Sequence, residues 1–121
     1  MGLHIGWVTI DATDVKKLAD FWEQALPSKR IYDDGAEEII LKTKEGGYKI
    51  LFLKAPDQKK TKNRLHLDLV PDDRDAEVAR LESLGATRAD IGQTGEETWV
   101  VMADPEGNEF CVLRPGTDSD T

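Results

Sequence analysis

Residues 106–112 read EGNEFCV, and residues 45–51 read EGGYKIL. Each stretch joins a glycine-containing turn signal to a run of residues typical of a strand. The two stretches lie 61 positions apart, which aligns Ile50 with Cys111. A match of this kind near the end of each half of the chain indicates an internal repeat.

The beginnings of the two halves match at an offset of 59 positions, which aligns Trp7 with His66 and Asp14 with Asp73. In each half a strand pattern is followed by capping residues and then by apolar residues at helical spacing. Strand patterns then close each half. The expected strands are 3–10, 37–43, 48–54, 64–70, 98–104 and 109–114, and the expected helices are 15–26 and 76–86.

Each half is too short to bury its own sheet, so the two are expected to pack together as one α+β domain. The expected boundaries are residues 1–56 for the first module and 63–115 for the second. Residues 57–62 would form the linker, and residues 116–121 a frayed polar tail.

Charge and composition restrict the partners. The 121 residues include 24 acidic side chains against 16 Lys and Arg, a formal net charge of −8, so the chain is expected to bind neither nucleic acid nor an anionic membrane. No apolar run approaches the length of a membrane span, and no secretory signal pattern opens the chain. The single Cys111 cannot form an intrachain disulfide, so a reducing, cytoplasmic setting is expected.

Strand alternation predicts which side chains share a face. In RLHLDLV, residues 64–70, the leucines would face a helix, while Arg64, His66 and Asp68 would lie on the opposite face. If the two sheets curl toward each other, the faces turned away from the helices line a shared cavity, which is the usual form of a small-molecule site. The expected lining residues are Trp7, Tyr48, Ile50, Phe52, Arg64, His66, Asp68, Trp99, Glu109 and Cys111.

Three stretches carry a family resemblance: TIDATDVKKLADFW at 9–22, NRLHLDLVPDDRDAEVARLESLGAT at 63–87, and WVVMADPEGNEFCVLRP at 99–115. With them the chain resembles the vicinal oxygen chelate superfamily, the glyoxalase, bleomycin-resistance and dioxygenase group. The resemblance implies two paired βαβββ modules around a cavity, and it also implies a homodimer.

The resemblance further implies positions for a divalent metal ion. In metal-using members the ligands are His or Gln, His and Glu, sometimes with a fourth ligand, and these positions fall on Trp7, His66, Cys111 and Ile50 here. Of these four, only His66 is a usual ligand there, because the indole of Trp7 and the sec-butyl group of Ile50 offer no lone pair for a metal. We therefore expect no metal or other cofactor, although a set of His66, Glu109 and Cys111 would suit zinc.

Several side chains allow two interpretations. Trp7 fits a core position or a stacking wall. His66 fits a structural partner of Asp68 or Arg64, and equally a catalytic acid or base, because a free imidazole changes charge near neutrality. Cys111 fits a small buried hydrophobe better than a nucleophile. Arg64 fits an ion pair or an anchor for an anionic group.

The main functional hypothesis is a protein that binds a small organic molecule in the cavity, with the acidic charge favouring a cationic one. The alternative is a metal-dependent lyase, isomerase or ring-cleaving dioxygenase, in which the metal acts as a Lewis acid. A weaker alternative is a regulatory or interaction module without a ligand. The sequence leaves open whether the protein is an enzyme.

Overall fold

The computed structural model describes residues 5–55, 66–89 and 98–116. The chain divides into two compact units, residues 1–58 and 59–121, and each is described by itself. Among the described residues no helix is long and apolar enough to cross a membrane. The predicted linker at 57–62 lies outside the described residues, as do positions 117–121 of the predicted tail, so the module boundaries stay predictions.

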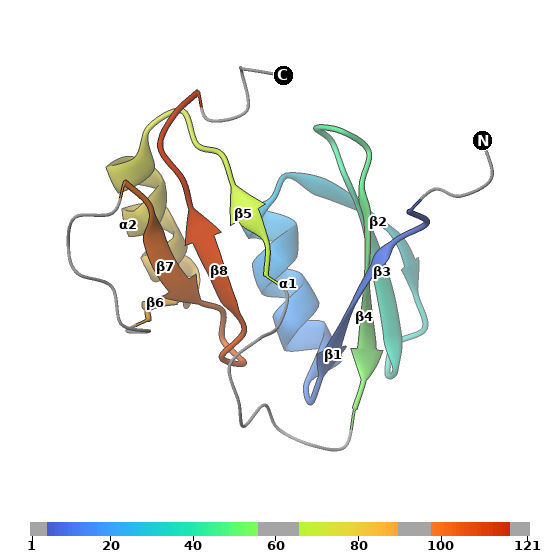
Figure 1. Cartoon of the computed structure of the whole chain (residues 1–121). Helices are drawn as coiled ribbons and strands as arrows, with labels where there is room; N and C mark the ends of the chain where they lie inside the picture. Colours follow the sequence, from blue (N-terminus) through green and yellow to red (C-terminus); the bar gives the residue numbers. More distant parts are fainter. Residues whose placement is uncertain (1–4, 56–65, 90–97, 117–121) are drawn as a thin grey trace. The chain divides into compact units, whose positions relative to one another are not determined.

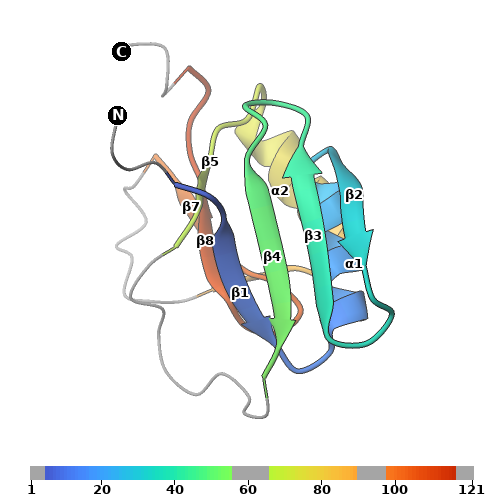
Figure 2. The same cartoon turned by 90° about the vertical axis from the view of Figure 1, so that its right-hand side faces the viewer.

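The first unit is a βαβββ module (Figure 1). Its elements are β1 (Val8–Ala12), α1 (Val15–Ala25), β2 (Ser28–Asp33), β3 (Glu38–Thr43) and β4 (Lys49–Lys54). The sheet order is β1-β4-β3-β2, with β1 parallel to β4 and the other neighbours antiparallel (Figure 2).

The second unit repeats that topology. Its elements are β5 (Asp68–Leu69), α2 (Arg74–Leu84), β6 (Thr87–Arg88), β7 (Val100–Ala103) and β8 (Glu109–Val112). The sheet order is β5-β8-β7-β6, again with the first strand parallel to the last. The predicted α+β fold of two βαβββ modules is therefore confirmed.

Local chemistry explains where both helices begin. The Asp14 carboxylate accepts a hydrogen bond from the Lys17 amide at 3.0 Å, and the Asp73 carboxylate accepts one from Ala76 at 3.1 Å. Each satisfies an amide that the first helical turn leaves without a partner. The aligned aspartates thus cap equivalent helices.

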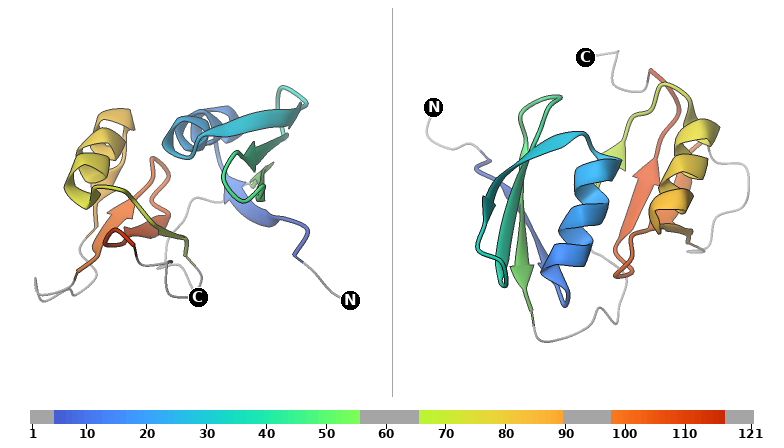
Figure 3. Two further views of the ribbon diagram at one scale, coloured as in Figure 1. Left: turned by 90° about the horizontal axis from the view of Figure 1, so that it is seen from above. Right: turned by 180° about the vertical axis from the view of Figure 1, so that it is seen from behind.

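Each helix lies against the sheet of its own unit (Figure 3), and buried apolar side chains hold it there. Leu18 and Trp22 of α1 are buried with Phe52 of β4, and Val78 and Leu81 of α2 are buried as well. Gly85 ends α2 in the left-handed conformation, φ 118°, which glycine adopts without steric cost. Both predicted helices are confirmed, although α2 spans Arg74–Leu84 rather than residues 76–86.

Some strand predictions differ from the structure. β1 begins at Val8, so the described residues 5–7 of the predicted strand 3–10 lie outside it, and among the described residues 66–70 of RLHLDLV only Asp68 and Leu69 form a strand. The edge strands β2 and β6 were not predicted from the sequence pattern. β2 reads SKRIYD, and because most of its side chains are exposed it lacks the apolar alternation that marks a half-buried strand.

Arg30 anchors this edge strand to α1. Its guanidinium donates to Asp20 at 2.8 Å, to Glu23 at 2.6 Å and to Asp33 at 3.0 Å. Burial lowers the pKa of Arg30, but the hydrogen bonds to these three carboxylates outweigh it and leave the pKa above its ordinary value. The strand is therefore held by a charge cluster where apolar packing is sparse.

The face predicted for Ile50 and Phe52 is wrong. Ile50 pairs with Val8 and Leu41, Phe52 pairs with Ile10 and Ile39, and both side chains are buried at 5% and 0% exposure. Cross-strand partners share a face of the sheet, so Ile50 and Phe52 belong to the core face.

The error comes from the length of a turn. The Thr43 amide donates to the Tyr48 carbonyl at 2.8 Å, whereas the Asp104 amide donates to the Asn108 carbonyl at 2.9 Å. The first turn therefore holds one more residue, and the offset between the halves falls from 61 to 60 within it. Leu51, not Ile50, is the counterpart of Cys111, and a slip of one residue reverses the face of every side chain that follows.

Candidate functional site

The parallel ladder between β5 and β8 places Asp68 directly opposite Cys111. The Cys111 amide donates to the Leu67 carbonyl at 2.9 Å, and the Leu113 amide donates to the Leu69 carbonyl at 2.8 Å. These backbone bonds fix the register of the two strands. Asp68 and Cys111 consequently extend from the same face of the second sheet, which we call the Cys111 face.

His66 joins Asp68 on this face. Its Nδ1 atom lies 3.1 Å from Oδ1 of Asp68, and the two side chains are 44% and 51% exposed. Leu67 and Leu69, which alternate with them, are half-buried, as the sequence predicts. A carboxylate bonded to Nδ1 orients the imidazole and leaves Nε2 to interact with another molecule.

Cys111 brings a third kind of donor atom to the same place. One ligand atom each from His66, Asp68 and Cys111 lie within 4.8 Å of one another. The side chain of Cys111 is 9% exposed, and its other cross-strand partner, Val101 on β7, is 2% exposed. The thiol therefore has an exposed carboxylate on one side and a buried apolar group on the other.

Glu109 stands apart from this group. It is the first residue of β8 and pairs with Ala103 on β7. It lies two residues before Cys111, which is about 7 Å along a strand, whereas Asp68 is directly across the ladder. Among the described residues, the structure thus brings Asp68 rather than Glu109 together with His66 and Cys111.

The remaining predicted site residues are divided between the two units. Trp7 directly precedes β1 and is 52% exposed, and Tyr48 directly precedes β4 and is 70% exposed. Trp99 precedes β7 and is 42% exposed. Arg64 lies outside the described residues. The roles proposed for these four side chains stay predictions.

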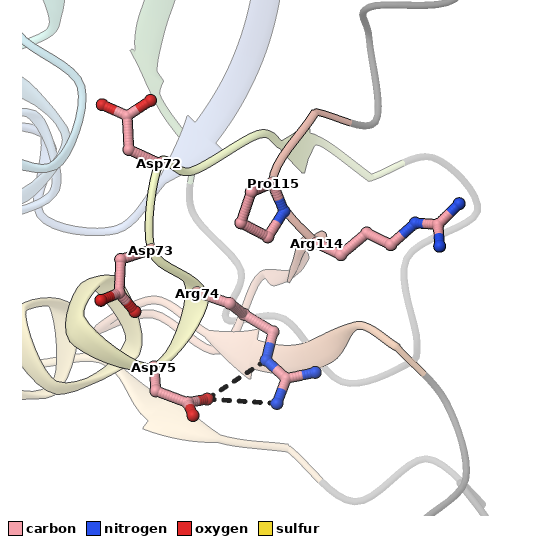
Figure 4. Close-up of a pocket in the computed structure, with 6 residues that line it drawn as sticks. All are labelled: Asp72, Asp73, Arg74, Asp75, Arg114 and Pro115. Carbon is pink, nitrogen blue, oxygen red and sulfur yellow. Dashed lines mark hydrogen bonds and ion pairs between the residues drawn. The ribbon is translucent and has the colours of Figure 1, made fainter.

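A shallow depression at the start of α2 was not predicted. It has a volume of about 350 Å³ and is lined by Asp72, Asp73, Arg74, Asp75, Arg114 and Pro115. The guanidinium of Arg74 donates to the Asp75 carboxylate at 3.2 Å (Figure 4). It also donates to the Thr98 carbonyl at 2.8 Å. The side chain of Arg114 extends away from the carboxylates (Figure 4). The signal in the sequence is the charge run DDRD at 72–75, which by itself indicates a helix start.

Comparisons with known proteins cover almost the whole chain. A family model described as a glyoxalase-like domain matches residues 7–113. No curated protein matches the chain significantly.

Solved structures share the fold at low sequence identity. The fosfomycin resistance protein FosX from Listeria monocytogenes is 17% identical, with a TM-score of 0.76 over 98% of this chain and 95% of that one. A mutant of it, complexed with Mn(II) and dihydroxypropylphosphonic acid, gives a TM-score of 0.74 at 17% identity, over 93% and 90% of the two chains. A glyoxalase/bleomycin resistance protein/dioxygenase family enzyme from Burkholderia phytofirmans PsJN gives 0.70 at 21% identity, over 89% and 95%.

Proposed function

The chain belongs to the glyoxalase-like domain family, and from that premise we propose that it binds a small organic molecule at the Cys111 face. The observation that carries the proposal is the exposed pair of His66 and Asp68, whose Nδ1 and Oδ1 atoms are 3.1 Å apart beside Cys111. An imidazole, a carboxylate and a thiol meet there, and a few convergent polar groups of this kind orient the ligand in a small-molecule site.

The charge of the site favours a neutral or cationic ligand. Asp68 contributes a carboxylate, and the whole chain carries a formal net charge of −8. This field attracts cations and repels anions before any contact forms. Arg64, if it lies at the site as the sequence predicts, would counter part of that charge.

The hard-metal site of the family does not fit this chain. The Listeria FosX mutant binds Mn(II), but that ion is a property of FosX and not of this chain. Here the first ligand position holds Trp7, and the fourth falls on Leu51 once the turn is aligned correctly. Neither side chain has a lone pair to donate, and Cys111 replaces a carboxylate with a soft sulfur. A four-ligand shell of oxygen and nitrogen is therefore incomplete whatever the positions of the side chains.

A thermal-shift screen of small neutral and cationic compounds tests the proposal. Compounds that bind should raise the melting temperature of the wild-type chain, because a ligand that binds only the folded state stabilises it. The shift should shrink in His66→Gln and in Asp68→Asn. It should persist in Asp72→Asn, a matched loss of one exposed carboxylate at the depression beside α2. Compounds whose shifts vanish in Asp72→Asn but not in Asp68→Asn would place binding at the wrong surface.

A second candidate function is acid–base catalysis by His66. The Asp68 carboxylate, with Oδ1 3.1 Å from Nδ1 of His66, favours it, because an imidazole oriented in this way can exchange a proton through Nε2. The test is to incubate each compound found in the screen with the protein and to follow its mass. Conversion that is lost in His66→Gln, with binding retained, supports catalysis, whereas an unchanged compound supports binding alone.

Assembly and location complete the proposal. We propose a homodimer in the cytoplasm, on the family resemblance and on the lone thiol, respectively. Sedimentation equilibrium of the full chain tests the dimer, and a mass of one chain across the working concentration range would contradict it.

A further inference from the structure

The three donor groups on the Cys111 face differ in kind. His66 offers a nitrogen, Asp68 an oxygen and Cys111 a sulfur, all within 4.8 Å. Magnesium and manganese prefer shells of oxygen, whereas a mixed set with a thiolate suits zinc. The chemistry of the group therefore selects a thiophilic ion, unlike the hard-metal shell excluded above.

The spacing of the donors is close to what one zinc ion requires. Zn–S and Zn–N bonds of about 2.3 Å and 2.0 Å at a tetrahedral angle place the two donor atoms about 3.5 Å apart. The donor atoms of His66, Asp68 and Cys111, which lie within 4.8 Å of one another, would need to approach by little more than about 1 Å to reach that separation. His66 and Asp68 are 44% and 51% exposed, so their side chains are free to rotate by that amount, while the ladder holds Cys111 in place.

We infer that His66, Asp68 and Cys111 form a site for a thiophilic divalent cation, zinc above all, built within the second unit alone. Three protein ligands leave the fourth tetrahedral position open, as in catalytic zinc sites. The inference does not depend on the identity of any organic ligand, because the ion alone is the probe.

The surroundings of Cys111 support this assignment. The thiolate is the form that binds a metal, and a buried thiolate needs a neighbouring positive charge. Val101 supplies none on the β7 side. On the β5 side the neighbour is the Asp68 carboxylate, and a divalent cation bound between the two groups would stabilise the thiolate form of Cys111 beside that negative charge.

Cobalt(II) binding to the reduced full chain tests the inference. Cobalt takes tetrahedral zinc sites, and a thiolate ligand gives an intense charge-transfer band in the near ultraviolet. We expect this band in the wild-type chain, displacement of cobalt by zinc, and loss of the band in Cys111→Ser. The zinc affinity should fall at least about tenfold in Asp68→Asn and in His66→Gln, since even outer partners of metal ligands contribute that much.

Glu109→Gln is the matched control. It removes a carboxylate from the same strand, two residues from Cys111, and should leave the zinc affinity within about twofold. Far-ultraviolet circular dichroism of each metal-free variant separates loss of binding from loss of fold. The inference is overturned if wild-type protein gives no charge-transfer band, if Cys111→Ser keeps it, or if Glu109→Gln abolishes binding while Asp68→Asn does not.

Discussion

Replacing Asp104 with alanine should destabilise the second unit. The carboxylate is part of a side chain only 4% exposed, and it accepts from the Glu106 amide at 2.9 Å and the Asn108 amide at 3.0 Å. It also accepts from the Asn108 side-chain nitrogen at 3.1 and 3.0 Å. Asp104→Ala leaves these donors in a partly buried turn without their acceptor.

The expected cost follows from those bonds. A hydrogen bond to a charged group contributes roughly 1.5–3 kcal/mol, and bonds that share one acceptor are not additive. Two backbone amides left without their acceptor therefore predict that the free energy of unfolding falls by about 3 kcal/mol. With an unfolding entropy of about 2.1 cal/mol/K per residue over 121 residues, the melting temperature should fall by about 12 °C.

Thermal and urea unfolding, followed by circular dichroism, measure this change. Asp34→Ala is the matched control, because the Asp34 carboxylate likewise accepts backbone amides, those of Ala36, Glu37 and Glu38, but in an exposed turn. Water can replace the acceptor there, so its melting temperature should fall much less. A shift of under about 3 °C for Asp104→Ala, or equal shifts for both variants, would refute the reasoning.

Three further changes test the fold. Phe52→Ala should lower the free energy of unfolding in urea by about 3–5 kcal/mol, because the ring is 0% exposed. Leu53→Ala, on the opposite face of β4, should lower it less, and equal losses would contradict the assignment of Phe52 to the core face. Gly85→Ala should cost about 1–3 kcal/mol, since φ of 118° strains any residue with a Cβ, and an unchanged melting temperature would contradict that. The hydrogen bond from the Gly35 amide and the Arg30 side chain lower the pKa of Asp33, and backbone amides, led by that of Glu38, lower the pKa of Asp34. The two carboxylates therefore stabilise the folded chain above pH about 4, the pKa of a free aspartate. This stabilisation is lost as the pH falls through their lower pKa values in the folded state. In an acid titration of stability, the double variant Asp33→Asn with Asp34→Asn should flatten this loss, and an identical slope would count against it.

The internal repeat made the fold predictable. EGNEFCV and EGGYKIL mark equivalent hairpins, and Asp14 and Asp73 cap equivalent helices. Strand parity was predictable only up to the first turn, because the extra residue between Thr43 and Tyr48 leaves no mark in the aligned letters. Ile50 and Phe52 were placed on the wrong face for that reason alone.

The candidate site was predictable in part. The alternation of RLHLDLV places His66 and Asp68 on one face, but the partner of Cys111 depends on the register between β5 and β8. Parity alone could not choose between Asp68 and Glu109, since both share a face with Cys111. The cross-strand distance makes that choice, and it is a property of the ladder rather than of either strand.

The central claim is that a small molecule binds at the Cys111 face, and amide chemical shifts test it most directly. The ¹⁵N-labelled chain would be titrated with a compound found in the thermal-shift screen, and the perturbed amides mapped on the sequence. The account predicts saturable shifts concentrated at residues 66–69 and 109–113. Binding that leaves those amides unchanged, and moves residues 72–75 and 114–115 instead, would contradict it.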